Sequence, residues 1–121
     1  MAEPVFEIGV KAEELYFDVL DKTTSRDHYP VRFRRLSDKI QELALDIYCG
    51  AVDANAIRTA TQAGREKAYD EKTLVISGCN KLLSLTKYSM RKNLISAATG
   101  EKWTSLIHDV KYMSLAWRKA V

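Results

Sequence analysis

A chain of 121 residues, 46% hydrophobic and 29% charged, has the length and composition of one soluble globular domain, residues 1–121. No apolar run approaches the roughly 18 residues that a membrane span needs, which excludes a transmembrane protein. The acidic N-terminus lacks the apolar segment of a secretory signal, so we expect a cytoplasmic protein. The two prolines and five glycines leave long uninterrupted stretches, which favours helices.

The net charge of +3 is unevenly distributed along the chain. Residues 1–30 hold seven acidic and three basic residues, a net charge of −4. Residues 31–121 hold nine acidic and sixteen basic residues, a net charge of +7. Such asymmetry is compatible with a polyanionic partner.

The first predicted helix runs from about Pro4 to about Thr24 and is apolar on two sides. One stripe suits a bundle core and comprises Ile8, Ala12, Leu15, Tyr16 and Val19. The other lies about 140–180° further round and comprises Phe6, Val10, Phe17 and Leu20. A small bundle cannot cover both, so we predict that the second stripe is an oligomer interface. The alternative is an unusually wrapped helix within a monomer.

The second predicted helix, residues 31–58, holds the densest basic cluster of the chain. Its core stripe comprises Phe33, Leu36, Ile40, Leu43, Ala44, Ile47 and Ala51. Another face carries basic residues followed by acidic ones, in the order Arg32, Arg35, Lys39, Glu42, Asp46 and Asp53. Exposed cations in the first turns oppose the helix dipole at a cost of about 0.3–1 kcal/mol each. We therefore expect another interaction to favour them.

Two interpretations of this cluster stay open. The cations bind the phosphates of RNA or DNA, or they pair with Asp27, Asp38 or the acidic first helix, within the chain or across a subunit interface. The candidate nucleic-acid-binding residues of the cluster are Arg32, Arg34, Arg35 and Lys39. Weaker candidates lie near helix C-termini, where the dipole favours cations, and are Lys87, Arg91, Lys92, Arg118 and Lys119.

The remaining sequence predicts two further amphipathic helices. The third runs over residues 63–93, with Thr61 as N-cap and Asn93 as terminator, and the fourth is capped by Ser96 or Thr99. Their apolar stripes comprise Val75, Cys79, Leu82, Leu83, Thr86 and Met90, then Trp103, Leu106, Ile107, Val110, Met113, Ser114 and Trp117. Four such helices with short connections predict an all-α, up-down-up-down four-helix bundle.

The sequence offers little to support catalysis. A metal site in a bundle requires inward carboxylates with Glu-x-x-His spacing, but Ser25 and Ser105 stand three residues before His28 and His108. The sequence shows no nucleophile elbow and no glycine-rich phosphate loop. We therefore predict a protein that is not an enzyme and has no metal and no cofactor.

Both cysteines, Cys49 and Cys79, fall on apolar helical stripes, so we predict buried reduced thiols. The tryptophans Trp103 and Trp117 lie on the heptad stripe of the fourth helix. They are therefore predicted to be core residues rather than platforms for stacking bases.

Several stretches together resemble a known four-helix bundle family. They are Lys11-Ala-Glu-Glu-Leu15, Leu20-Asp-Lys-Thr-Thr24, Tyr29-Pro30, Arg32-Phe33, Ile40 through Ala44-Leu-Asp-Ile47 to Ala54-Asn55, Cys79-Asn-Lys-Leu-Leu83, Asp109-Val-Lys111 and Ala116-Trp-Arg-Lys119. The family contains the ribosomal-RNA intervening-sequence proteins and the accessory variability determinant (Avd) proteins of diversity-generating retroelements. The later stretches are similar to the Avd-like branch.

This resemblance implies a homopentameric barrel of four-helix protomers with a basic surface. In the Avd branch it implies binding of nucleic acid and of a partner reverse transcriptase. Arg32 matches the family's basic residue before the aromatic, and Arg34 and Arg35 extend it. The final helix lacks the Gly-Gly-Trp ending common among Avd proteins and keeps Trp117 after Ala116. The alternative function is an oligomeric protein-interaction scaffold of the intervening-sequence type, with no direct role in nucleic-acid binding.

Overall fold

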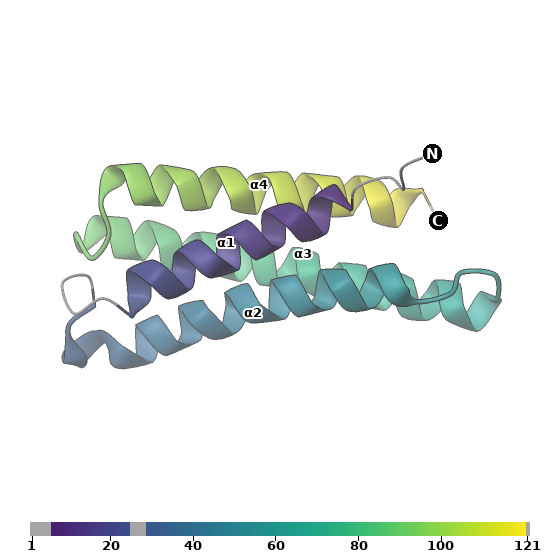
Figure 1. The fold of residues 1–121 in the computed structure, drawn as a ribbon, viewed down its shortest axis with the longest axis horizontal. Coiled ribbons are helices and arrows are strands. Elements are labelled where there is room, and N and C mark those ends of the chain that lie inside the picture. The colour runs from purple at the N-terminus through teal and green to yellow at the C-terminus, as the bar shows by residue number, and fades with distance from the viewer. Residues whose placement is uncertain (1–5, 25–28, 121) are drawn as a thin grey trace.

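The computed structural model describes residues 6–24 and 29–120, which are almost entirely helical (Figure 1). These residues form four α-helices and a short 3-10 turn, and no strand. The elements are α1 (Glu7–Thr23), η1 (Val31–Phe33), α2 (Arg34–Ala56), α3 (Gln62–Arg91) and α4 (Ala97–Lys119). The expected all-α class is confirmed, and the helix bounds lie within a few residues of the predicted ones. Pro4, Asp27 and His28 lie outside the described residues.

The four helices run lengthwise beside one another, with α1 and α3 opposite in direction to α2 and α4 (Figure 1). Each helix packs against two neighbours, in the cyclic order α1, α2, α3, α4. The predicted up-down-up-down arrangement is therefore present in the described chain. No helix in residues 6–24 or 29–120 combines the length and the apolar character that crossing a bilayer requires.

The predicted core stripes meet between the helices. Ala12, Leu15, Ile40 and Ile47 are completely buried. Trp103 is also completely buried, and its indole N–H donates to a carboxylate oxygen of Asp18 at 2.7 Å. Buried tryptophans commonly find such a partner because an unpaired N–H in a dry core is costly. The core assignment of Trp103 is confirmed.

The prediction for the two cysteines is half right. Cys79 is fully buried, and burial raises the pKa of its thiol to about 12, which makes the thiol unreactive. Cys49 is exposed, so its predicted burial is wrong. Residues two apart on a helix point about 200° away from each other, and Ile47 takes the core-facing direction.

The helix ends follow local sequence signals. Thr61 accepts a hydrogen bond from the Gly64 N–H at 3.0 Å, and Ser96 accepts one from the Thr99 N–H at 3.1 Å. Both are N-caps, so Ser96 rather than Thr99 caps α4. After α3, Asn93 adopts a left-handed conformation with φ 56°.

The backbone hydrogen bonds around Asn93 satisfy the last carbonyls of α3. The Asn93 N–H donates to Met90 at 3.0 Å, and the Leu94 N–H donates to Ser89 at 2.9 Å. This is the Schellman pattern of a helix C-terminus. The predicted role of Asn93 as terminator is confirmed.

Candidate nucleic-acid interface

The start of α2 and the end of α3 lie at the same end of the bundle (Figure 1). Tyr29 lies just before α2. Its buried phenol donates a hydrogen bond to Ser89 of α3 at 2.7 Å, which links the start of α2 to the end of α3. Burial raises the pKa of this phenol, so the hydroxyl stays a neutral donor. Cations from the two helices therefore gather on one pole of the molecule, which we call the basic end.

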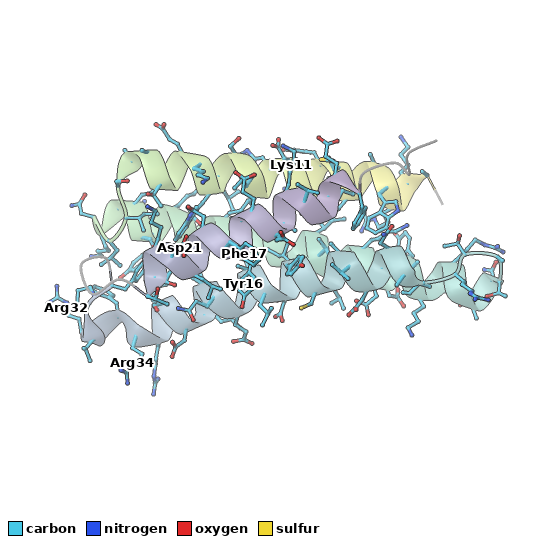
Figure 2. The ribbon with its side chains drawn as sticks, viewed as in Figure 1. Lys11, Tyr16, Phe17, Asp21, Arg32 and Arg34 are labelled. Carbon is cyan, nitrogen blue, oxygen red and sulfur yellow. The ribbon has the colours of Figure 1, made fainter. Side chains whose placement is uncertain are left out.

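Three arginines occupy the first turns at this end. Arg32, Arg34 and Arg35 are all exposed, and Arg32 and Arg34 project away from the bundle (Figure 2). The Arg32 guanidinium carbon lies 5.2 Å from the centroid of the Phe33 ring. Phe33 is the N-cap residue of α2 and provides no side-chain hydrogen bond to the helix N-terminus. The positive end of the helix dipole and three cations thus face solvent together.

Within the described residues, none of these three arginines forms an ion pair, whereas Lys39 lies 3.7 Å from Glu42. The acids of α1 have other partners. Lys102 of α4 lies 3.3 Å from Asp18 and 4.0 Å from Glu14.

The side of α1 that carries Lys11, Glu14 and Asp18 therefore faces α4. Lys11 lies 3.1 Å from Asp109, and this hydrogen bond and charge raise the pKa of the Lys11 ammonium. Glu13 accepts a hydrogen bond from the Tyr48 hydroxyl at 3.0 Å, which raises the pKa of that phenol. Within one chain, α1 does not neutralise the arginines of α2. Of the other proposed partners, Asp38 lines a pocket together with Arg34 but forms no ion pair in the described part of the chain, and Asp27 lies outside the described residues.

An open groove of about 320 Å³ runs between α2 and α3. Asp46 and Asp53 line it from α2, and Glu71, Leu74 and Lys81 line it from α3. The same stripe of α2 continues toward the basic end through the residues Lys39 and Arg35. The same stripe of α3 continues from Lys81 through Tyr88 to Lys92.

The face along α2 and α3 is therefore acidic in one half and basic in the other. Sequence reasoning identified the α2 half of this pattern but missed Lys81 and Tyr88. The helical spacing of Leu74, Lys81, Tyr88 and Lys92 could have indicated them, because residues seven apart share a face.

The remaining predicted cations do not all join this surface. Arg91 is exposed in the last turn of α3 at the basic end. Lys87 lines a separate groove toward α4, together with His108 and Asp109. The cations Arg118 and Lys119 end α4 and lie at the opposite pole (Figure 1).

At that opposite pole, Arg118 is held within the chain. Its guanidinium donates to the Thr73 hydroxyl at 3.1 Å and lies 5.1 Å from the centroid of the Tyr69 ring. Arg118 and Lys119 line a pocket with Arg65 and Tyr69. Glu66 and Asp70 line the same pocket, so these cations belong to a surface of mixed charge, separate from the basic end.

The predicted oligomer stripe of α1 divides into two parts. Val10 and Phe17 are 54% and 52% exposed, whereas Leu20 is half-buried. Phe6 is also half-buried and packs edge-on against Trp117, with ring centroids 5.4 Å apart. Val10 and Phe17 are thus the members of the stripe most available to a second copy.

Exposed side chains of α2 extend this apolar surface. The Tyr16 ring lies 6.1 Å from both Phe17 and Tyr48, which links α1 to α2 (Figure 2). Leu45 and Val52 are 39% and 44% exposed, and they lie one helical turn on either side of Tyr48. We call Val10, Phe17, Tyr16, Tyr48, Leu45 and Val52 the apolar patch.

The chain matches no protein-family model, no curated protein and no solved structure. Within the described residues, no three histidine, cysteine or acidic side chains gather in a way that could hold a metal ion. The chemistry that this surface offers is therefore that of exposed guanidinium and ammonium groups beside partly exposed rings.

Proposed function

We propose that this chain is a non-catalytic accessory protein that binds RNA or DNA through phosphate contacts at the basic end. The observation that carries the proposal is the set of three exposed arginines, Arg32, Arg34 and Arg35, at the uncapped start of α2. Within the described residues, two acids of α1, Glu14 and Asp18, pair with Lys102 of α4, and no acid lies within ion-pair distance of the three arginines.

This arrangement of charges is unfavourable for the isolated helix. Exposed cations at a helix N-terminus are repelled by the positive end of the helix dipole. Phosphate oxygens, in contrast, are attracted both to the cations and to the helix N-terminus. Guanidinium groups suit phosphate because their planar fork can donate two parallel hydrogen bonds. A polyanion therefore converts an unfavourable cluster into a favourable one.

Other cations extend the contact surface without changing its chemistry. Lys39 lies in α2 and Lys92 is the C-cap residue of α3, both on the stripes that continue from the groove toward the basic end, and Arg91 lies in the last turn of α3. Phosphate contacts of this kind position a nucleic acid without reading its sequence. We therefore expect binding with weak sequence preference.

Assembly belongs to the same proposal. The exposed apolar patch supports contact with another copy of the chain, because burying exposed apolar side chains such as Phe17 is favourable in free energy. The sequence resemblance to Avd-like proteins supports a homopentamer and a reverse transcriptase as protein partner. The apolar patch also favours the second candidate function, an oligomeric scaffold in which the basic residues serve subunit contacts alone.

An alanine variant of the three arginines separates the two functions. We expect Arg32→Ala/Arg34→Ala/Arg35→Ala to weaken binding to a fluorescent oligonucleotide at least ten-fold while the oligomer seen by light scattering persists. The matched control is Arg58→Ala/Lys67→Ala/Lys111→Ala, which removes the same charge away from the basic end. If the arginine variant loses the oligomer and keeps full nucleic-acid binding, the scaffold function is correct.

A further inference from the structure

Three tyrosines are strongly exposed in the described chain, and each has a cation near its ring. Tyr69, Tyr88 and Tyr112 are 48%, 42% and 60% exposed. The nearby cations are Arg118, Lys92 and Lys111, at 5.1, 5.8 and 5.6 Å from the ring centroids. Of these three rings, Tyr88 is the one that lies at the basic end, in the last turn of α3.

Tyr88 lies on the stripe of α3 that borders the groove toward α2. The preceding member of that stripe, Lys81, lines the groove directly, and Lys92 follows Tyr88 one turn later. Across the groove, Arg35 and Lys39 continue the α2 stripe that contains Asp46. By helical register, an exposed aromatic ring of α3 and cations of both α2 and α3 therefore share one face at the basic end, beyond the groove.

An exposed aromatic ring among cations should bind single-stranded and duplex nucleic acid differently. Cations alone suffice for the backbone of a duplex, whose bases are already stacked and offer no free face. In a single strand the bases can leave their neighbours and stack on an aromatic side chain, while the cations bind the adjacent phosphates. An exposed ring among phosphate-binding cations is the arrangement that single-strand binders use.

We propose that the basic end takes single-stranded nucleic acid in preference to duplex, with one base stacked on Tyr88 and flanking phosphates held by Arg35, Lys39 and Lys92. This inference rests on the proposed function, because it names the class of nucleic acid bound at the same surface. Tyr88 provides an aromatic face on which a base stacks, and the cations provide the positive charge that binds phosphates. The acidic residues Asp46, Asp53 and Glu71 repel the strand and confine it to the basic half.

The test compares three probes at one salt concentration, by fluorescence anisotropy on the full chain. They are an oligothymidine of about 15 nucleotides, an abasic strand of the same length, and a duplex of the same length. We expect the oligothymidine to bind more tightly than the duplex. Tyr88→Leu should weaken oligothymidine binding by about ten-fold and leave binding to the abasic strand and the duplex unchanged. Tyr88→Trp should retain or improve oligothymidine binding, since it keeps a stacking face.

Tyr112→Leu is the matched control, because Tyr112 is also exposed beside a lysine but lies on α4 away from the basic end. It should change none of the three affinities. The inference is overturned if Tyr88→Leu binds oligothymidine as the wild type does, or loses the abasic strand equally. In either case the proposed function stands as long as the arginine triple variant loses binding. If that triple variant binds all three probes normally, the proposed function itself is wrong.

Discussion

Lys72 is a buried lysine that the sequence gives no reason to expect. It lies in α3 with 1% of its surface exposed, and its ammonium is 4.2 Å from the centroid of the Trp117 ring. Burial lowers the pKa of this ammonium because a low-dielectric environment disfavours the charged form. The attraction of the ring offsets part of that cost. A folded pKa below the unfolded one means that stability rises as the pH increases from the folded toward the unfolded value.

We expect Lys72→Met to raise the free energy of unfolding by about 1 kcal/mol at neutral pH, since an apolar chain of similar length replaces a buried charge. The gain should shrink at alkaline pH, where the wild-type lysine loses its proton in the folded state. Urea unfolding at the two pH values measures both effects. The exposed Lys67→Met in the same helix is the control and should change stability by less than about 0.5 kcal/mol. A loss of stability in Lys72→Met would mean that the contact with Trp117 outweighs the cost of burial.

Asn93 is the described non-glycine residue with a positive φ, at 56°. Because a β-branched side chain clashes with the backbone in this region, Asn93→Val should cost about 1–2 kcal/mol of unfolding free energy. Asn93→Gly should leave stability unchanged or slightly higher, since glycine is the residue most favoured there. Thermal unfolding of the pair measures the difference. Equal stabilities for the valine and glycine variants would show that the Schellman turn after α3 does not hold in solution.

At the scale of elements, a glycine allows α2 and α3 to pack closely. A Cβ atom on Gly50 would lie 2.9 Å from a methyl carbon of Val75, whose β-branched side chain is stiff. Gly50→Ala should therefore destabilise the bundle by about 1–3 kcal/mol, even though alanine is the better helix former by about 1 kcal/mol. Ser84→Ala, at an exposed position of α3, is the control and should be neutral or mildly stabilising. A stabilising Gly50→Ala would contradict the close packing of these helices.

Helical periodicity predicts each element and most of its buried face, because apolar residues at that spacing must be covered by something. Ile47, Leu82 and Ile107 at the centres of the stripes are completely buried as expected, whereas end members such as Phe33, Met90 and the predicted core residue Trp117 are only half-buried. Periodicity does not say which neighbour covers a face. For that reason the sequence marks the Lys11 side of α1 as polar without revealing that it pairs with α4.

The candidate site, too, could be predicted from the sequence only in part. The basic cluster of α2 is evident from the sequence because consecutive arginines oppose the local dipole. Its meeting with Tyr88 and Lys92 depends on the antiparallel pairing of α2 with α3, which brings distant residues to one end. The prediction for Cys49 was wrong, and the burial of Lys72 was not foreseen, for a related reason. Residue type was a poor guide to burial where the packing of particular helices decided it.

At the scale of the whole molecule, the surface proposed to bind nucleic acid differs from the surface proposed for assembly. The basic end lies at one pole, whereas the apolar patch lies along α1 and α2.

Phe17→Glu should disrupt self-association, because burying a carboxylate in the place of a phenyl ring removes the favourable free energy of apolar burial and adds a desolvation cost. We expect at least a ten-fold weaker assembly by light scattering at matched concentrations, with an unchanged helical circular dichroism spectrum. Tyr112→Glu on α4 is the matched control and should leave the assembly intact. Identical masses for Phe17→Glu and the wild type would exclude α1 as the interface.

The central claim is that the exposed arginines at the start of α2 contact phosphates, and the salt dependence of binding tests it most directly. Each phosphate contact with a single strand contributes about −0.7 to the slope of log affinity against log salt concentration. The wild type should therefore show a steep negative slope, and the Arg32→Ala/Arg34→Ala/Arg35→Ala variant should show a slope about two units shallower. The account is contradicted if the wild-type affinity is independent of salt, or if removing the three arginines leaves the slope unchanged.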